Sequence, residues 1–187
     1  SIPELPDERK KRYIEKYGLP DYDAAILTSS RHLSDFFDET VAAYGNAKAI
    51  SNWIMVDVMK RINSGNPDSS CIKLRPVFLA KLIKLTDDNV ISTRMAKQIF
   101  DIMWDTGMDP ADIIRKYDFT MITDRSVIRG LVSDVIKENP GSVTDFKKGK
   151  LKAKDFLIGQ VMRMSSGKAH PGIVNSVLDD ELAKYLN

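Results

Sequence analysis

The chain has 187 residues, of which 43% are hydrophobic and 29% are charged, and its formal net charge is +2. This composition is normal for a globular protein and argues against general disorder, because there is enough apolar surface to offset the entropy lost on ordering. No apolar run approaches the roughly 20 residues that a membrane-spanning helix needs. The single cysteine, Cys71, excludes an intrachain disulfide and a cysteine-based zinc site. We therefore expect a cytoplasmic protein without a membrane partner.

Helical periodicity runs through nearly the whole chain, so the sequence predicts an all-α fold. Ser30, Asn46, Ser92 and Asp124 each precede a run of apolar residues at offsets of three and four, as helix-capping residues do. In chain order, helices are expected over about residues 6–17, 21–28, 31–44, 47–64, 76–85, 93–106, 110–114, 124–138, 143–148, 150–165 and 171–186.

Two breaks divide this pattern. Residues 63–75 (NSGNPDSSCIKLR) are rich in Ser, Asn, Pro and Gly and form the longest expected loop. Residues 117–123 (YDFTMIT) have little helical signal and include the one faint strand alternation. We therefore place a domain boundary near residue 122, between a multi-helix domain over residues 1–122 and a small three- to four-helix tail domain over residues 123–187. Because the tail is small for an independent core, we expect its neighbour to support it.

Positive charge is concentrated in one segment. Residues 146–170 hold seven basic side chains and one acidic side chain, Asp155, whereas the residues on either side carry a slight negative excess. An anionic partner would bind such a segment, and a solvated lysine-rich helix is the alternative. The candidate anion-binding residues are Lys148, Lys150, Lys152, Gly159, Arg163 and Lys168.

In the helix expected over residues 150–165, Lys152, Gly159 and Arg163 lie on the side opposite the one that faces the core. At about 100° per residue, Lys152 and Arg163 lie about 20° apart and about 16 Å apart along the axis, with Gly159 between them. A mid-helix glycine costs roughly 1 kcal/mol relative to alanine, so a neighbouring helix or a sugar-phosphate backbone is expected to approach it closely. The opposite side carries the expected apolar stripe of Ala153, Leu157, Val161 and Met164.

Aromatic residues at helical spacing, Phe156 among them, are assigned to the core. With little aromatic interleaving among the basic residues, stacking on single-stranded bases is not expected. A structured nucleic acid that is bound through its phosphates fits the pattern better.

No catalytic residue and no metal ligand is expected. Cys71 has no histidine nearby in the sequence to activate it. Gly167 and Lys168 resemble a phosphate-binding loop only faintly, because Met162 stands where that motif needs a glycine and Ala169 where it needs Ser or Thr. The paired acids at Asp87 and Asp179 adjoin helix ends or surfaces, where carboxylates are common.

The segment FLIGQVMRMSSGKAHPGIVN, residues 156–175, resembles the tail signature of the B subunit of the tRNA-dependent amidotransferase and of its free-standing YqeY-type relatives. It departs from the family pattern at Asp155, which replaces a glycine, at Arg163, which replaces a lysine, and at His170, which replaces an asparagine. Further similar stretches are residues 5–37, 51–55, 91–92, 96–100 and 122–124, so the resemblance covers nearly the whole chain.

The resemblance implies a role in converting Glu-tRNA(Gln) or Asp-tRNA(Asn) to Gln-tRNA(Gln) or Asn-tRNA(Asn). The family uses ATP, magnesium and ammonia that a partner subunit releases from glutamine. Its catalytic domain would precede Ser1, so ATP and magnesium are expected there and no cofactor is expected in this chain. The chain would then be the helical domain and YqeY-like tail, whose expected partners are tRNA and the amidase (A) and small (C) subunits.

Two other hypotheses stay open at the level of the sequence. The chain could be a helical protein-protein interaction module with a solvated basic face, or a small autonomous enzyme. A steep salt dependence of tRNA binding would favour the tRNA-binding hypothesis over the interaction module, and turnover by the purified chain would favour the enzyme.

Overall fold

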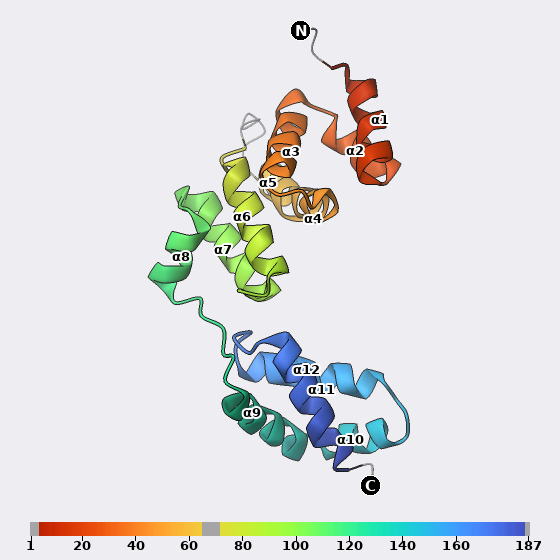
Figure 1. Ribbon diagram of the computed structural model, residues 1–187, viewed down its shortest axis with the longest axis vertical. Helices are drawn as coiled ribbons and strands as arrows, with labels where there is room; N and C mark the ends of the chain where they lie inside the picture. The colour runs from red at the N-terminus through yellow and green to blue at the C-terminus, as the bar shows by residue number, and fades with distance from the viewer. Residues whose placement is uncertain (1–3, 65–71, 186–187) are drawn as a thin grey trace. The chain divides into compact units, whose positions relative to one another are not determined.

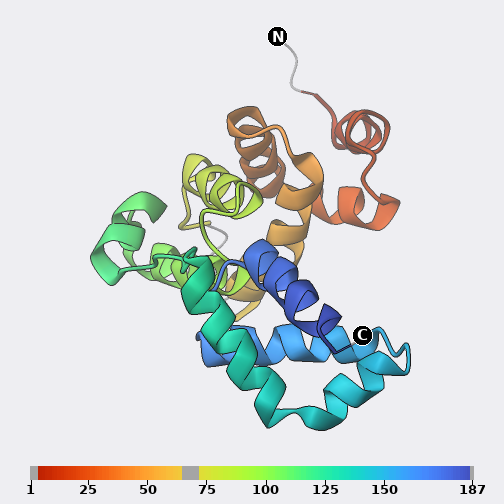
Figure 2. The same cartoon turned by 60° about the horizontal axis from the view of Figure 1, so that its bottom comes forward.

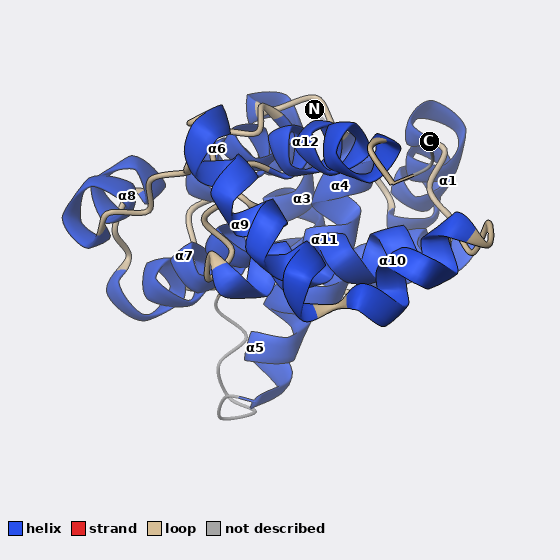
Figure 3. Cartoon of the chain, turned by 90° about the horizontal axis from the view of Figure 1, so that it is seen from below, coloured by secondary structure: helices blue, strands red, loops and turns tan. Residues whose placement is uncertain are grey.

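The computed structural model describes residues 4–64 and 72–185 (Figure 1). Helices are the regular elements of these residues, which confirms the predicted all-α fold (Figure 3). The faint strand signal near residue 122 corresponds to a single parallel bridge between Ile122 and Ala169. Of the loop predicted over residues 63–75, residues 65–71 lie outside the described residues, and the preceding helix extends to Ser64.

The described residues form the following helices. In chain order they are α1 (Pro6–Tyr17), α2 (Asp21–Leu27), α3 (Arg31–Ala43), α4 (Ala47–Trp53), the π-helical turn η1 (Ile54–Val58), α5 (Met59–Ser64), α6 (Pro76–Asp87), α7 (Thr93–Thr106), α8 (Pro110–Tyr117), α9 (Arg125–Glu138), α10 (Pro140–Lys147), α11 (Lys152–Met164) and α12 (Pro171–Ala183).

The predicted helix starts are confirmed by hydrogen bonds from backbone N–H groups to the capping side chains. Ser30 Oγ accepts from the Leu33 N–H at 3.2 Å, and Asn46 Oδ1 accepts from the Ala49 N–H at 3.2 Å. Asp124 Oδ1 accepts from the Ser126 N–H at 2.7 Å, and Ser92 Oγ accepts from the Met95 N–H at 3.3 Å. Each bond satisfies a donor that has no partner inside its own helix, which is why these short polar residues begin helices.

One helix begins earlier than the sequence indicated. α10 starts at Pro140, whereas the apolar spacing predicted a start near Val143. Proline suits the first helical position because its fixed φ is already helical and the N–H that it lacks would have no partner there.

The chain divides into two compact units. Unit 1 comprises residues 1–87 and 99–113, and unit 2 comprises residues 88–98 and 114–187. The long helix α7 therefore contributes its first turns to unit 2 and the remainder to unit 1. The domain boundary that the sequence places near residue 122 stays a prediction.

In unit 1, α1 packs on α2 and α2 on α3 around a buried aromatic pair. The rings of Tyr13 and Phe37 lie 4.6 Å apart between centroids, and both side chains are fully buried. The Tyr13 hydroxyl donates a hydrogen bond to the Ser34 carbonyl at 3.1 Å. Burial raises the pKa of Tyr13, so the phenol stays protonated and keeps this bond.

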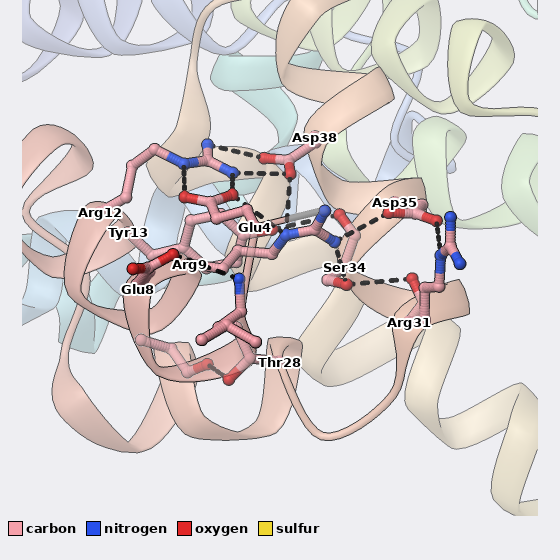
Figure 4. Close-up of polar contacts among 12 residues, drawn as sticks. Glu4, Glu8, Arg9, Arg12, Tyr13, Thr28, Arg31, Ser34, Asp35 and Asp38 are labelled. Carbon is pink, nitrogen blue, oxygen red and sulfur yellow. Dashed lines mark hydrogen bonds and ion pairs between the residues drawn. The ribbon is translucent and has the colours of Figure 1, made fainter. Parts of the chain in front are cut away.

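Charged side chains of α1 and α3, with Glu4 before α1, form ion pairs near Tyr13 (Figure 4). Arg12 Nη2 lies 2.7 Å from Glu4 Oε2 and 2.9 Å from Asp38 Oδ2, and Arg9 Nη1 lies 2.8 Å from Asp35 Oδ1. Hydrogen bonds from Arg12 lower the pKa of Glu4, and those from Arg9 lower the pKa of Asp35. We call these five residues the α1–α3 ion-pair network, and in it each arginine is neutralised by carboxylates of the same unit.

Unit 2 is built around α9, α10, α11 and α12, the blue-green to blue part of the chain in Figure 2. α9 packs on α12, and α11 packs on α9, α10 and α12. The shared core is aliphatic and contains Ile128, Val132, Val135, Ile136, Val143, Leu157, Val161, Ala169, Val174, Val177, Leu178 and Leu182. This core fixes which side of α11 faces outward.

Candidate nucleic-acid interface

Helix α11 has one buried and one exposed side. Leu157 and Val161 are fully buried, which confirms the centre of the predicted apolar stripe. The prediction is wrong at the ends of that stripe, since Ala153 is only partly buried and Met164 is 41% exposed. Met164 lies in the last turn of the helix, where the core of unit 2 no longer covers it. The exposed side of α11 carries Lys152, Asp155, Phe156, Gly159 and Arg163.

Gly159 lies in open space. A Cβ atom at this position would have no heavy atom of the described residues within 4 Å, apart from the helix itself and its chain neighbours. Close packing of a neighbouring helix therefore does not explain this glycine within the part of the chain that the structure describes. The backbone is therefore open to a partner at Gly159, as it also is at Gly130 of α9, so openness alone does not identify a binding position.

Three of the predicted cations are exposed and have no carboxylate partner in the part of the chain that the structure describes. Lys148 directly follows α10 as its C-cap residue, Lys152 begins α11, and Arg163 lies in the last turn of α11. Among residues 4–64 and 72–185, no carboxylate lies within 4.0 Å of any of the three charged groups. A lysine or arginine to which the described part of the chain offers no carboxylate can attract a phosphate without first breaking an ion pair there.

The other two predicted cations have partners in unit 2. Lys150 Nζ lies 3.0 Å from Asp145 Oδ1. Lys168 Nζ lies 3.7 Å from Asp118 Oδ2 and 3.4 Å from the Asp118 carbonyl oxygen. A hydrogen bond from Thr120 and the charge of Lys168 hold the pKa of Asp118 below its usual range. Lys150 and Lys168 therefore differ from Lys148, Lys152 and Arg163, which have no carboxylate partner among the described residues.

The turn after α11 ties together distant parts of unit 2. The Ile122 N–H donates to the Lys168 carbonyl at 2.7 Å, and the His170 N–H donates to the Ile122 carbonyl at 3.0 Å. The Ser92 hydroxyl donates to the Gly167 carbonyl at 2.8 Å. Gly167 has a φ of +79°, and a Cβ there would lie 2.8 Å from Cδ of Arg94, so any other residue would strain the backbone and displace the Arg94 side chain. This glycine has a structural role, in contrast to Gly159.

The prediction that Phe156 belongs to the core is wrong. The residue is 46% exposed, because the core of unit 2 contacts α11 through Leu157 and Val161 on the other side. The sequence contains the correcting signal. At about 100° per residue, Phe156 lies only about 40° from Lys152 and about 20° from Arg163, on the side assigned to the partner. Helical spacing between aromatic residues does not by itself indicate burial, and the angle to the neighbouring cations is the better guide here.

Other kinds of site find no support in the described part of the chain. No group of three or more His, Cys, Asp or Glu side chains there is arranged to hold a metal ion. In the same residues, no helix combines the length and the apolar character needed to cross a membrane. The exposed side of α11, together with Lys148, is thus the feature of the described residues that best fits an anionic ligand.

Comparison with known proteins gives a consistent result. The family described as the GatB domain matches residues 35–182. The B subunit of the aspartyl/glutamyl-tRNA(Asn/Gln) amidotransferase of Caldicellulosiruptor bescii is 47% identical over 186 residues, and that of Geobacillus thermodenitrificans is 44% identical over 184 residues. The corresponding protein of Caldanaerobacter subterraneus is 42% identical over 184 residues. In each case the match covers 98% of this chain and 39% of the relative.

Proposed function

The chain belongs to the GatB domain family. From this premise we propose that it binds tRNA through Lys148 and the exposed side of α11. The proposed contact, which we call the α10–α11 surface, consists of Lys148, Lys152, Gly159 and Arg163. The observation that carries the proposal is that its three cations lack carboxylate partners among the described residues. Phosphate groups would supply the missing partners, and binding would release the counterions now associated with the RNA.

The open position of Gly159 supports a nucleic-acid backbone as the ligand. It lies between Lys152 and Arg163 on one face of α11, and a Cβ at this position would have no described neighbour within 4 Å beyond its own helix. Cations about 16 Å apart along the axis would contact separated phosphates, while the sugar-phosphate chain passes over the glycine. Contacts of this kind recognise the shape and charge of a folded RNA and carry no information on its base sequence.

The names of the relatives extend this proposal from tRNA binding to the reaction of a whole enzyme. They are named as B subunits of aspartyl/glutamyl-tRNA(Asn/Gln) amidotransferases, and this chain spans 39% of their length. We propose that the chain serves the same reaction, in which Glu-tRNA(Gln) or Asp-tRNA(Asn) becomes Gln-tRNA(Gln) or Asn-tRNA(Asn). In this view it holds the tRNA body beside the amidase and small subunits. The steps that need ATP, magnesium and glutamine-derived ammonia would occur in parts of the enzyme that this chain does not cover.

The test is a salt titration of tRNA binding. Fluorescence titrations of the chain with tRNA(Gln) and tRNA(Asn) transcripts give the affinity at several salt concentrations. We expect Lys152→Gln with Arg163→Gln to weaken binding and to lower the slope of log affinity against log salt by about two, close to one per lost phosphate contact. Thermal melts of the variant should match the wild type, because neither side chain is packed or paired.

A matched control removes the same charge elsewhere in unit 2. Lys137 and Lys184 are exposed and already paired, with Asp134 at 3.8 Å and with Glu181 at 2.6 Å. Changing both to Gln should leave most of the salt slope in place. If both double variants lost equal tRNA affinity and salt slope, the effect would be due to net charge alone. An unchanged affinity in the Lys152 and Arg163 variant would overturn the proposal.

A further inference from the structure

Phe156 is the least expected residue on the exposed side of α11. It is 46% exposed, and it is absent from the residues that form or flank the core of unit 2. Among the described residues, none of the close ring pairs includes it, and no cation lies over its ring. A single exposed apolar side chain is common on a protein surface, so the surroundings of Phe156 decide whether it indicates a ligand.

The surroundings of Phe156 are those of the α10–α11 surface. Lys152 lies one helical turn before it, and Arg163 lies seven residues after it at nearly the same angle around the helix. Neither cation has a carboxylate partner among the described residues. Asp155, the acidic residue of this side, lies about 100° around the helix from Phe156, at the edge of the exposed arc.

Gly159 leaves the ring accessible. Side chains on an α-helix lean toward its N-terminus, so a side chain at position 159 would lie over the turn that contains Phe156. With glycine there, and with no described atom within 4 Å of the missing Cβ, a flat group can approach the ring from that side. A ring with an open approach between two cations suits a group that is planar and attached to negative charge.

We propose that Phe156 stacks on an unpaired nucleobase of the RNA whose phosphates bind the α10–α11 surface. The inference rests on the proposed function, in which the cations contact only the RNA backbone. It adds a contact between Phe156 and a base. Every nucleobase has a π face, so the contact selects for an accessible, unpaired base and tolerates its identity. A protein partner would use the ring as an apolar anchor and would need carboxylates beside Lys152 and Arg163. RNA carries negative charge at regular spacing along its backbone, so its phosphates would contact both cations.

The experiment compares three substitutions of Phe156 in the 187-residue chain, with a tRNA transcript as the probe. Phe156→Ala should weaken binding about 10- to 100-fold, the range found when a stacking aromatic is removed. Phe156→Trp should bind as well as the wild type or better. Phe156→Leu keeps apolar bulk without a π face, so it should lose nearly as much affinity as the alanine variant. None of the three should change the salt slope, because no charge is altered.

Two controls separate stacking from general damage. Tyr117 is an aromatic residue of unit 2 with a similar exposure of 48%, and Tyr117→Ala should bind tRNA like the wild type. A fully paired RNA duplex serves as the second probe, because it presents no unpaired base in its interior. The wild type and Phe156→Ala should bind the duplex equally. Thermal melts confirm that the substituted surface residues leave the fold intact.

The outcomes distinguish this inference from the proposed function. If the wild type does not bind tRNA with a steep salt dependence, the proposed function fails. If it does, and Phe156→Ala binds tRNA like the wild type, the stacking contact alone is overturned. Retention of affinity by Phe156→Leu but not by Phe156→Ala would also overturn stacking, since it indicates apolar packing of the kind that a protein surface provides.

Discussion

The α1–α3 ion-pair network and the α10–α11 surface both contain basic side chains, but the surroundings of these side chains differ. In the network, Arg9 and Arg12 lie against Glu4, Asp35 and Asp38 at hydrogen-bonding distances. On the α10–α11 surface, Lys148, Lys152 and Arg163 are exposed, with no carboxylate of the described residues within 4.0 Å. The two regions contain similar charges, and they differ in whether the fold provides the counterion.

This difference indicates where charge serves stability and where it is available for binding. A partly buried arginine with two carboxylates holds helices together, and its removal leaves those carboxylates close to each other. An exposed lysine without a partner contributes little to folding, because water and salt already solvate it. We therefore expect substitutions in the network to alter unfolding and substitutions on the surface to alter RNA binding, with little overlap.

The largest expected effect is a loss of stability in the network. Arg12→Ala removes hydrogen bonds to Glu4 and Asp38, and we expect it to lower the free energy of unfolding by about 1–3 kcal/mol. Urea unfolding checks this value, and the affinity for tRNA at a temperature where the variant is folded should stay unchanged. The control is Lys11→Ala, whose side chain is 73% exposed and lies 3.8 Å from Glu15, with an expected loss below about 0.5 kcal/mol. Equal losses in the two variants would contradict a special role of the network.

The next effect separates stability from binding at one position. Gly159→Ala should raise the free energy of unfolding by up to about 1 kcal/mol, because alanine favours the helix and meets nothing within 4 Å. The same change should weaken tRNA binding if a backbone passes over this residue. Gly130→Ala in α9 is the matched control, since this glycine is also helical and equally open. It should give the same gain in stability and no change in affinity, and thermal melts with tRNA titrations would show either result.

Acid pH should weaken the network by a smaller amount. The pKa values of Glu4 and Asp35 are lowered in the folded state by hydrogen bonds from arginine. The unfolded chain therefore takes up protons first as the pH falls, and stability is lost from about pH 5 downward through the lowered native values. Because both carboxylates are partly exposed, we expect each to contribute below about 1 kcal/mol. Urea unfolding between about pH 7 and pH 3.5 should show a shallower pH dependence for Glu4→Gln than for the wild type, and an unchanged dependence would contradict the role of Glu4.

The smallest expected effect converts a paired cation into an unpaired one. Asp145→Asn removes the partner that lies 3.0 Å from Lys150, so this lysine should become available to phosphate. We expect tRNA affinity at low salt to rise about two- to threefold, with a small increase in the salt slope. Asp134→Asn, which frees Lys137 on α9, provides the comparison and should leave both quantities nearly unchanged. A decrease in affinity for Asp145→Asn would indicate that Lys150 contributes more when it is held in place.

The sequence by itself determined the helical elements and the centre of the core-facing side of α11. Capping residues such as Ser30 and Asp124 act on N–H groups two or three positions away, so local chemistry is enough to place a helix start. Leu157 and Val161 are predicted correctly because helical periodicity alone brings them to one side. The family resemblance, which the match over residues 35–182 confirms, is equally a property of the sequence.

Tertiary structure alone decided which charges and which glycine are available to a partner. Lys150 and Lys152 are two residues apart in a basic segment, yet within residues 4–64 and 72–185 a carboxylate lies beside Lys150 and none beside Lys152. Gly159 and Gly167 belong to the same signature, yet one lies in open space and the other against the Arg94 side chain of a distant segment. The pairing of Lys150 with Asp145 depends on the shape of the turn after α10, and the contact at Gly167 depends on Arg94, which is far away along the chain. Periodicity and composition hold no information on either contact. The exposure of Phe156 differs from these cases, since its angle to Lys152 and Arg163 around the helix already indicates it.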